Sequence, residues 1–190
     1  MNLTSKKYIL ASNSPRRKEL LTNLGLDFQV RVKEIDENYP PELARAEVAE
    51  YLAAHKASAY REQLQPEEVI ITADTIVCLD DTILNKPYDH AQATRMLTML
   101  SGRSHEVYTG VCLLSSEKSV VFHDVTTVHF RNLTRDEIDF YINHYKPFDK
   151  AGSYGAQDWL GLVGIERIEG SYFNVMGLPV HRLYEELLVF

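Results

Sequence analysis

The N-terminal strand, loop and helix constrain the fold of this chain more than any other segment. Residues 8–11 form a short apolar run, a Ser-rich loop begins at Ser12, and a helical segment extends to about Leu24. Ser14 suits the N-cap of that helix. Pro15 suits its first position, where the missing N–H costs no hydrogen bond. A strand that leads through a polar loop into a helix is the start of an α/β fold.

Strands and helices alternate along the rest of the chain. Strand patterns lie at 27–32, in two or three pieces within 69–87 (interrupted at Ala73–Asp74 and turned at Asp80–Asp81), at 105–114 and at 119–130. Helical patterns lie at about 41–63, at 90–101 and at 134–145, with a short helix at the C-terminus. Internal repeats and linkers are absent from the sequence. The pattern predicts one α/β domain over residues 1–190 with a mixed β-sheet.

The first helix carries charges of the wrong sign for its position. Arg16, Arg17 and Lys18 follow its cap, although the N-terminus of a helix is itself positive and favours anions. The same chain caps another helix in the expected way, with Thr134 and Glu137 spaced as a capping box. The contrast indicates that the first helix binds an anion such as phosphate. The alternative is that the two arginines are solvated surface residues.

Composition limits the partners and the compartment. The formal net charge is −7, which argues against a nucleic-acid polymer as partner but allows a small phosphorylated ligand in a local basic pocket. No apolar run has the length of a membrane helix, and the apolar run at 8–11 is too short for a signal peptide. Cys78 and Cys112 each lie in an apolar run, as expected for buried thiols in a reducing compartment. We expect no membrane association and a cytoplasmic location.

Two charged residues occupy positions that otherwise look buried. Lys56 lies four residues after Leu52 on the inward face of a predicted helix, so it either extends to the surface or binds an anion in a cleft. Asp74 interrupts an apolar strand region, where it could be a general base, a Mg²⁺ ligand or an Asx turn at a strand end. A second acidic residue, Glu37, could complete a magnesium pair, because Mg²⁺ needs only one or two carboxylates beside substrate phosphate.

Two further polar residues suit the same ligand. Lys86 precedes a proline at a turn, and Gln157 lies in a glycine-punctuated loop, where its amide could read the edge of a base. Each is also compatible with an ordinary solvated side chain. From the residues alone, a phosphatase, a nucleotide hydrolase and a sugar-phosphate enzyme all remain open.

The ordered motifs resemble one family over nearly the whole chain. The segments "LASNSPRRKELL", "IDE", "LAAHKA", "ADTIV", "NKP", "LSGRSHEVYTGV" and "DKAGSYGAQ…GSYFNVMGLPV" run in order from about Ile9 to Pro179 and resemble the Maf nucleoside triphosphate pyrophosphatases. The resemblance implies an elongated Maf/ITPase-like α/β domain, in which a twisted mixed sheet flanked by helices divides two lobes with the active cleft between them. It implies hydrolysis of a nucleoside triphosphate to a monophosphate and pyrophosphate, with a divalent metal (Mg²⁺, Mn²⁺ or Co²⁺).

The resemblance also implies a role for each candidate residue. Asp74 would accept the proton of the attacking water and, with Glu37, hold the metal. The residues that would bind the phosphates are Arg17, Lys56 and Lys86, with Ser12 and Ser14 in the phosphate loop.

The same resemblance implies a choice of base. Arg16, Thr75 and Gln157 match the branch that acts on dTTP and UTP, whereas the branch that acts on 7-methyl-GTP tends to have Trp, Gln and Glu there. The chain departs from the family pattern beside Gln157, at Ala156 and at Asp158–Trp159. The implied role is the removal of modified pyrimidine nucleotides, and the implied assembly is a homodimer. The alternatives are a pyrophosphatase for another base, such as 7-methyl-GTP, and a non-catalytic nucleotide-binding regulator of cell division.

Overall fold

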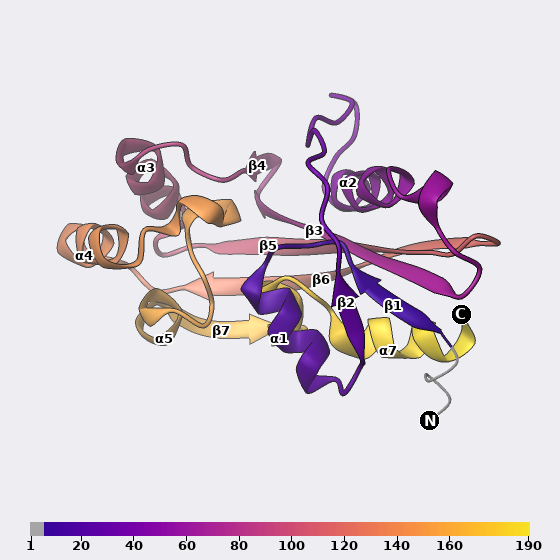
Figure 1. Cartoon of the computed structure of the whole chain (residues 1–190). Coiled ribbons are helices and arrows are strands. Elements are labelled where there is room, and N and C mark those ends of the chain that lie inside the picture. The colour runs from indigo at the N-terminus through magenta and orange to yellow at the C-terminus, as the bar shows by residue number, and fades with distance from the viewer. Residues whose placement is uncertain (1–5) are drawn as a thin grey trace. The chain divides into compact units, whose positions relative to one another are not determined.

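The computed structural model describes residues 6–190, which form a seven-stranded β-sheet and the helices that accompany it (Figure 1). The strands are β1 (Lys7–Leu10), β2 (Phe28–Val30), β3 (Glu68–Leu79), β4 (Thr82–Leu84), β5 (Ser104–Leu114), β6 (Ser119–Phe130) and β7 (Ile165–Glu169). The α-helices are α1 (Pro15–Asn23), α2 (Ala46–Ser58), α3 (His90–Leu100), α4 (Arg135–Tyr145), α5 (Trp159–Gly164), α6 (Tyr172–Met176) and α7 (Val180–Val189).

The sheet has the strand order β2-β1-β3-β5-β6-β7, and β4 pairs with β3 beside this path. Strand β1 is parallel to both β2 and β3, whereas β3 and β4, and likewise β6 and β7, are antiparallel. The predicted mixed α/β sheet is therefore confirmed. Among residues 6–190, no helix has both the length and the apolar character needed to cross a bilayer.

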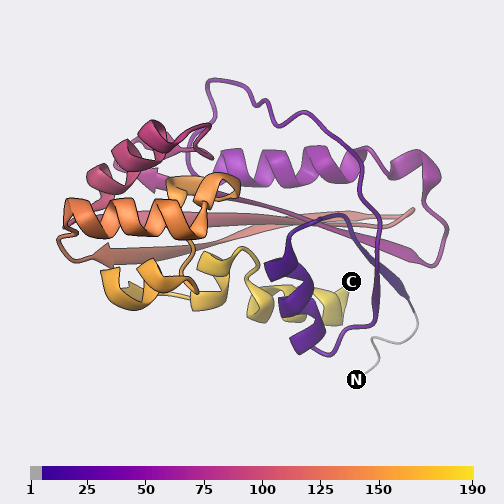
Figure 2. The same ribbon diagram turned by 60° about the vertical axis from the view of Figure 1, so that its left-hand side comes forward.

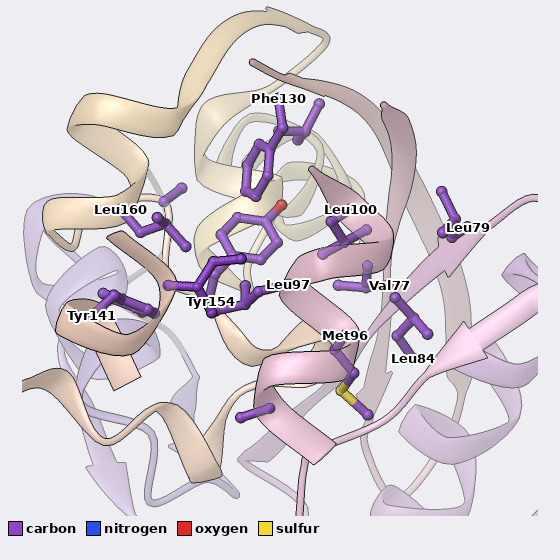
Figure 3. Packing of buried hydrophobic residues seen from close by; sticks show 14 of the residues in the cluster. Val77, Leu79, Leu84, Met96, Leu97, Leu100, Phe130, Tyr141, Tyr154 and Leu160 are labelled. Atoms are coloured by element: carbon purple, nitrogen blue, oxygen red, sulfur yellow. The ribbon is translucent and has the colours of Figure 1, made fainter. Parts of the chain in front are cut away.

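The chain divides into two compact units, each with its own core. The first consists of the residues up to Asp74 with Thr109–Asp124 and Gly177–Phe190, and the second of Thr75–Tyr108 with Val125–Met176. The core of the first unit is a cluster of Ile9, Ala53, Ala57, Tyr60, Ile70, Cys112 and Leu114. The core of the second unit packs side chains of β3, α3, β6, α4 and the segment 154–160, including Leu97, Phe130, Tyr141, Tyr154 and Leu160 (Figure 3).

Helix α2 packs against the part of the sheet that belongs to the first unit (Figure 2). The Thr72 hydroxyl of β3 donates a hydrogen bond of 2.7 Å to the Ala53 carbonyl of α2. Gly110 of β5 lets the helix approach closely, because a Cβ atom there would come within 2.3 Å of the Ala49 backbone. These contacts fix the position of α2, and therefore of Lys56 near its C-terminal end.

Several local predictions are confirmed. The Ser14 side chain caps α1, with Pro15 in the first turn, and no acidic residue lies in that turn. The capping box of α4 is complete, because Thr134 and Glu137 exchange both of its hydrogen bonds. Cys78 and Cys112 are both buried and are not joined in a disulfide.

Other predictions were wrong in extent. The helix predicted over 41–63 is shorter, since α2 starts at Ala46 after Arg45, whose φ of +48° is not helical, and Arg61–Gln63 form a separate 3-10 turn. Strand β3 runs without a break through Asp74, because a partner side chain satisfies that carboxylate. The Gly-rich segment forms α5 and β7, which were not predicted, and β2 has only three residues.

Candidate active site

Asp74 and Lys56 form an ion pair in the first unit. The Lys56 ammonium, on α2, donates a hydrogen bond of 2.6 Å to Oδ1 of Asp74 in β3. Their side chains are only 15% and 11% exposed, so the pair is largely withdrawn from water. Lys56 therefore pairs with a carboxylate of its own chain instead of extending to the surface. Asp74 lies inside β3 and is not an Asx turn at a strand end. Removing one partner of such a buried ion pair strongly destabilises the folded protein, because the other charge is left buried without compensation.

Glu37 brings a second carboxylate to the same ammonium. Its Oε1 accepts a hydrogen bond of 2.6 Å from Lys56 Nζ, and its side chain is 45% exposed. Glu37 lies in the segment between β2 and α2. Because one nitrogen contacts both carboxylates, the oxygens of Glu37 and Asp74 lie within reach of a single cation.

The Ser-rich loop after β1 begins beside Ile71 of β3, three residues before Asp74. The parallel register pairs Leu10 with Ile71, and the Ala11 N–H donates to the Ile71 carbonyl at 3.0 Å. The loop that follows is organised by its own hydroxyls. Ser12 Oγ accepts from the Ser14 N–H at 3.1 Å, and Ser14 Oγ accepts from the Arg17 N–H at 3.4 Å.

Arg17 is held toward this loop and is not a solvated surface residue. Its Nε donates to the Gly177 carbonyl at 2.8 Å, and its Nη1 lies 3.5 Å from Ser12 Oγ. Burial lowers the pKa of the Arg17 guanidinium, while the Asp74 and Glu37 carboxylates act in the opposite direction. A guanidinium keeps its charge in proteins, so Arg17 presents a fixed cation near both carboxylates. Arg16, the residue before Arg17, is half-buried.

The remaining predicted residues belong to the second unit. Thr75 follows Asp74 directly in β3 and is half-buried, and Lys86 is exposed in the segment after β4. Gln157 is half-buried before α5, and its Oε1 is buried without a hydrogen-bond partner among the residues that the structure describes. The structure thus brings Ser12, Ser14, Arg17, Glu37, Lys56 and Asp74 together within one unit.

A family comparison covers this entire arrangement. The Maf family, described as "Maf-like protein", matches residues 7–190, which include every candidate residue. The chain belongs to the Maf family. A relative from Phocaeicola vulgatus is named dTTP/UTP pyrophosphatase and is 54% identical over 187 residues, covering 98% of this chain and 97% of that protein.

Other relatives of this Maf protein have the same name. The relative from Porphyromonas gingivalis strain W83, also named dTTP/UTP pyrophosphatase, is 50% identical over 189 residues, covering 98% of this chain and 95% of that protein. Among solved structures, the Staphylococcus aureus Ham1 protein matches 66% of this chain and 72% of its own, with 16% identity and a TM-score of 0.49.

Two carboxylates of this Maf protein could hold a divalent metal. Within residues 6–190, no group of three or more His, Cys, Asp and Glu side chains converges on one point. The pair of Glu37 and Asp74 does converge, on Lys56 Nζ. Mg²⁺ is commonly held by one or two carboxylates together with substrate phosphate oxygens and water, so these two residues fit such an ion.

Each unit holds a contact around a candidate residue that was not predicted from the sequence. The backbone carbonyl of Gly177, 160 residues away in the chain, positions Arg17. Every residue has a backbone carbonyl, so the residue type at this position could not indicate the contact. The hydroxyl of Tyr141 contacts Gly155 and Asp158 on either side of Gln157. Tyr141 was identifiable only as an apolar position of α4.

Proposed function

We propose that this Maf protein hydrolyses dTTP and UTP between the α and β phosphates and releases the nucleoside monophosphate and pyrophosphate. The observation that carries the proposal is the buried Asp74 carboxylate, held by Lys56 at 2.6 Å in the same unit as the Arg17 guanidinium. A base next to fixed cations suits attack of water on a polyphosphate. The shared name of relatives that are about half identical over nearly their full length supports the choice of reaction.

Asp74 acts as the general base in the proposed mechanism. Its carboxylate takes a proton from a water molecule while the water oxygen bonds to the α phosphorus. The bond from that phosphorus to the oxygen bridging to the β phosphorus breaks, and pyrophosphate leaves with the electron pair. Negative charge grows on the leaving group, and the cations Arg17, Lys56 and Lys86 stabilise it.

In the proposed mechanism, the phosphate loop binds the triphosphate of the substrate before the reaction. Ser12 and Ser14 supply hydroxyls, and the N-terminus of α1 supplies free N–H groups and a partial positive charge. The bound anion reverses the unfavourable balance that the arginines create at this helix end. A divalent cation such as Mg²⁺, Mn²⁺ or Co²⁺ held by Glu37 and Asp74 would add positive charge at the phosphate oxygens.

Arg16, Thr75 and Gln157 select the base in the same proposal. Thymine and uracil share an N3–H donor, and the Gln157 Oε1 is a buried acceptor without a partner among residues 6–190. Selection for these two bases would remove modified pyrimidine nucleotides before they enter nucleic acid. We further propose that the enzyme acts in the cytoplasm as a homodimer, with no nucleic-acid or membrane partner.

A nucleotide panel tests the proposal. Initial rates of pyrophosphate release are measured for dTTP, UTP, CTP, GTP, 7-methyl-GTP and 5-methyl-UTP, each with Mg²⁺, Mn²⁺ and Co²⁺. We expect the highest kcat/KM for dTTP, UTP and 5-methyl-UTP. Faster turnover of 7-methyl-GTP would overturn the base assignment. Tight nucleotide binding without turnover under all conditions would instead favour a binding regulator.

A further inference from the structure

The segment Tyr154–Asp158 in the second unit presents one side chain whose hydrogen bonding is incomplete. Gln157 Oε1 is buried and has no partner within residues 6–190. A buried acceptor of this kind costs free energy unless a ligand supplies a donor. An acceptor selects a donor well only if the backbone that carries it is fixed, so the contacts of this segment determine how sharply Gln157 can discriminate.

Tyr141 of α4 fastens this segment on both sides of Gln157. Its hydroxyl donates to Oδ2 of Asp158 at 2.7 Å and accepts from the Gly155 N–H at 3.1 Å. One phenol thus uses its donor and its acceptor on the two residues that flank the dipeptide Ala156–Gln157. Burial and the hydrogen bond to the Asp158 carboxylate raise the pKa of Tyr141, so the phenol stays protonated.

Other contacts within the second unit close the segment into a tight turn. The Asp158 N–H donates to the Gly155 carbonyl at 3.1 Å. Lys150 Nζ lies 3.7 Å from Asp158 Oδ2 and 2.8 Å from Asp149 Oδ1, which places a cation beside the Asp158 carboxylate. Gly161 of α5 packs against the turn so closely that a Cβ there would come within 1.9 Å of the Ala156 carbonyl oxygen.

The Asp158 carboxylate does not serve as a helix cap. Asp158 occupies the N-cap of α5, but its side chain makes no capping hydrogen bond. Tyr141 and Tyr154 both point into the core of the second unit in the close view (Figure 3). Tyr154, at the other end of the segment, bonds His105 Nε2 through its hydroxyl at 2.7 Å.

We propose that Tyr141 and Asp158 form a positioning clamp that holds Gln157 for recognition of uracil and thymine. The inference rests on the proposed function and deepens it, because it assigns base discrimination to two residues that need not touch the nucleotide. Uracil offers an N3–H donor, whereas cytosine has an unprotonated acceptor at N3. A fixed Gln157 oxygen favours uracil and repels cytosine, and a mobile amide can rotate to accommodate either.

The experiment compares kcat/KM for UTP and CTP in the wild type and in Tyr141→Phe. The two substrates share the same triphosphate, so a general loss of folded enzyme lowers both values and leaves their ratio unchanged. We expect the UTP/CTP ratio to fall about tenfold, as for loss of one well-placed hydrogen bond. The matched control is Tyr145→Phe, one helical turn further along α4, whose ring stacks on Tyr141. We expect it to keep the wild-type ratio.

A second pair of variants covers the case that Tyr141→Phe does not fold. Asp158→Asn keeps an oxygen that accepts from the Tyr141 hydroxyl and should retain most of the discrimination. Asp158→Ala removes that oxygen and should lose discrimination to the same extent as Tyr141→Phe. An unchanged UTP/CTP ratio in Asp158→Ala, or a wild-type ratio near one, would overturn the clamp. Absence of UTP and dTTP turnover in the wild type would instead overturn the proposed function.

Discussion

The ammonium of Lys56 lies 2.6 Å from Oδ1 of Asp74 and 2.6 Å from Oε1 of Glu37, so one cation links the two acidic residues of the site. This contact explains how β3 can carry a carboxylate in the middle of an apolar strand. It also ties the position of α2 to the site, since Lys56 reaches Asp74 only because α2 packs against β3 and β5.

Asp74→Asn should abolish most turnover and leave nucleotide binding nearly intact. Asparagine has a similar shape but cannot take a proton from water, so we expect kcat to fall by at least ~100-fold. Pyrophosphate release measures the loss, and calorimetry with a non-hydrolysable UTP analogue measures the binding. The control is Asp81→Asn, at the exposed turn between β3 and β4. Full activity of Asp74→Asn would remove this residue from the mechanism.

Lys56→Met should make the protein respond more strongly to divalent cations. Removal of the ammonium leaves Glu37 and Asp74 without their shared partner and lowers the free energy of unfolding by about 3 kcal/mol. A cation that occupies the same position restores part of the loss, so millimolar Mg²⁺ should raise the Tm of the variant more than that of the wild type. Thermal denaturation with and without Mg²⁺ measures the difference.

The double variant Lys56→Met with Glu37→Gln is the control for this response. It has only one of the two carboxylates, so the extra stabilisation by Mg²⁺ should largely disappear. An equal response to Mg²⁺ in all three proteins would contradict the assignment of Glu37 and Asp74 as the metal pair.

Arg17→Ala should lose phosphate binding with little change in stability. Loss of the hydrogen bond to the Gly177 carbonyl costs about 1 kcal/mol, and removal of a cation from the N-terminus of α1 returns about 0.3–1 kcal/mol. The two effects nearly cancel. We expect inorganic pyrophosphate to raise the Tm of the wild type and of the control Lys18→Ala, but not of Arg17→Ala. A clear drop in Tm with normal kinetics would make Arg17 a structural residue only.

His105 should make the protein sensitive to acid. Burial, with His129 nearby, lowers the pKa of His105 from 6.5 to about 3. Below pH 6.5 the imidazole therefore binds a proton in the unfolded chain but not in the folded chain. The free energy of unfolding falls as the pH drops from 6.5 toward 3. The expected slope is on the order of 1 kcal/mol per pH unit.

The variant His105→Gln keeps a polar partner for the Tyr154 hydroxyl but cannot titrate. Urea denaturation from pH 7.5 to pH 4 should show lower stability than the wild type at pH 7.5 and a shallower loss toward acid. The control His181→Gln, at an exposed position of α7, should keep the wild-type slope. A wild-type slope in His105→Gln would mean that other groups cause the acid sensitivity.

Local rules predicted the parts of the fold that depend on near neighbours. The caps at Ser14 and Thr134 are both formed, because each needs only residues within the next turn of helix. The break predicted at Asp74 was wrong because the residue that satisfies its carboxylate, Lys56, lies 18 positions away. Strand β7 was missed because its partner is β6, far earlier in the chain.

The site was predictable as residue types but not as contacts. Charges of unfavourable sign marked Arg17, and a charge on an apolar stripe marked Lys56, since each breaks a local rule that a ligand or partner must offset. Residue patterns could not show that Glu37 and Asp74 share one ammonium, nor that Tyr141 holds the turn around Gln157. Both facts depend on tertiary packing.

The identity of the products tests the central claim most directly. UTP is incubated with the wild-type protein and Mg²⁺ in water enriched in ¹⁸O, and the products are separated and weighed by mass spectrometry. The proposed mechanism predicts UMP and pyrophosphate in equal amounts, with the heavy oxygen in UMP, because water attacks the α phosphorus. Formation of UDP and inorganic phosphate, or heavy oxygen in the pyrophosphate, would contradict it.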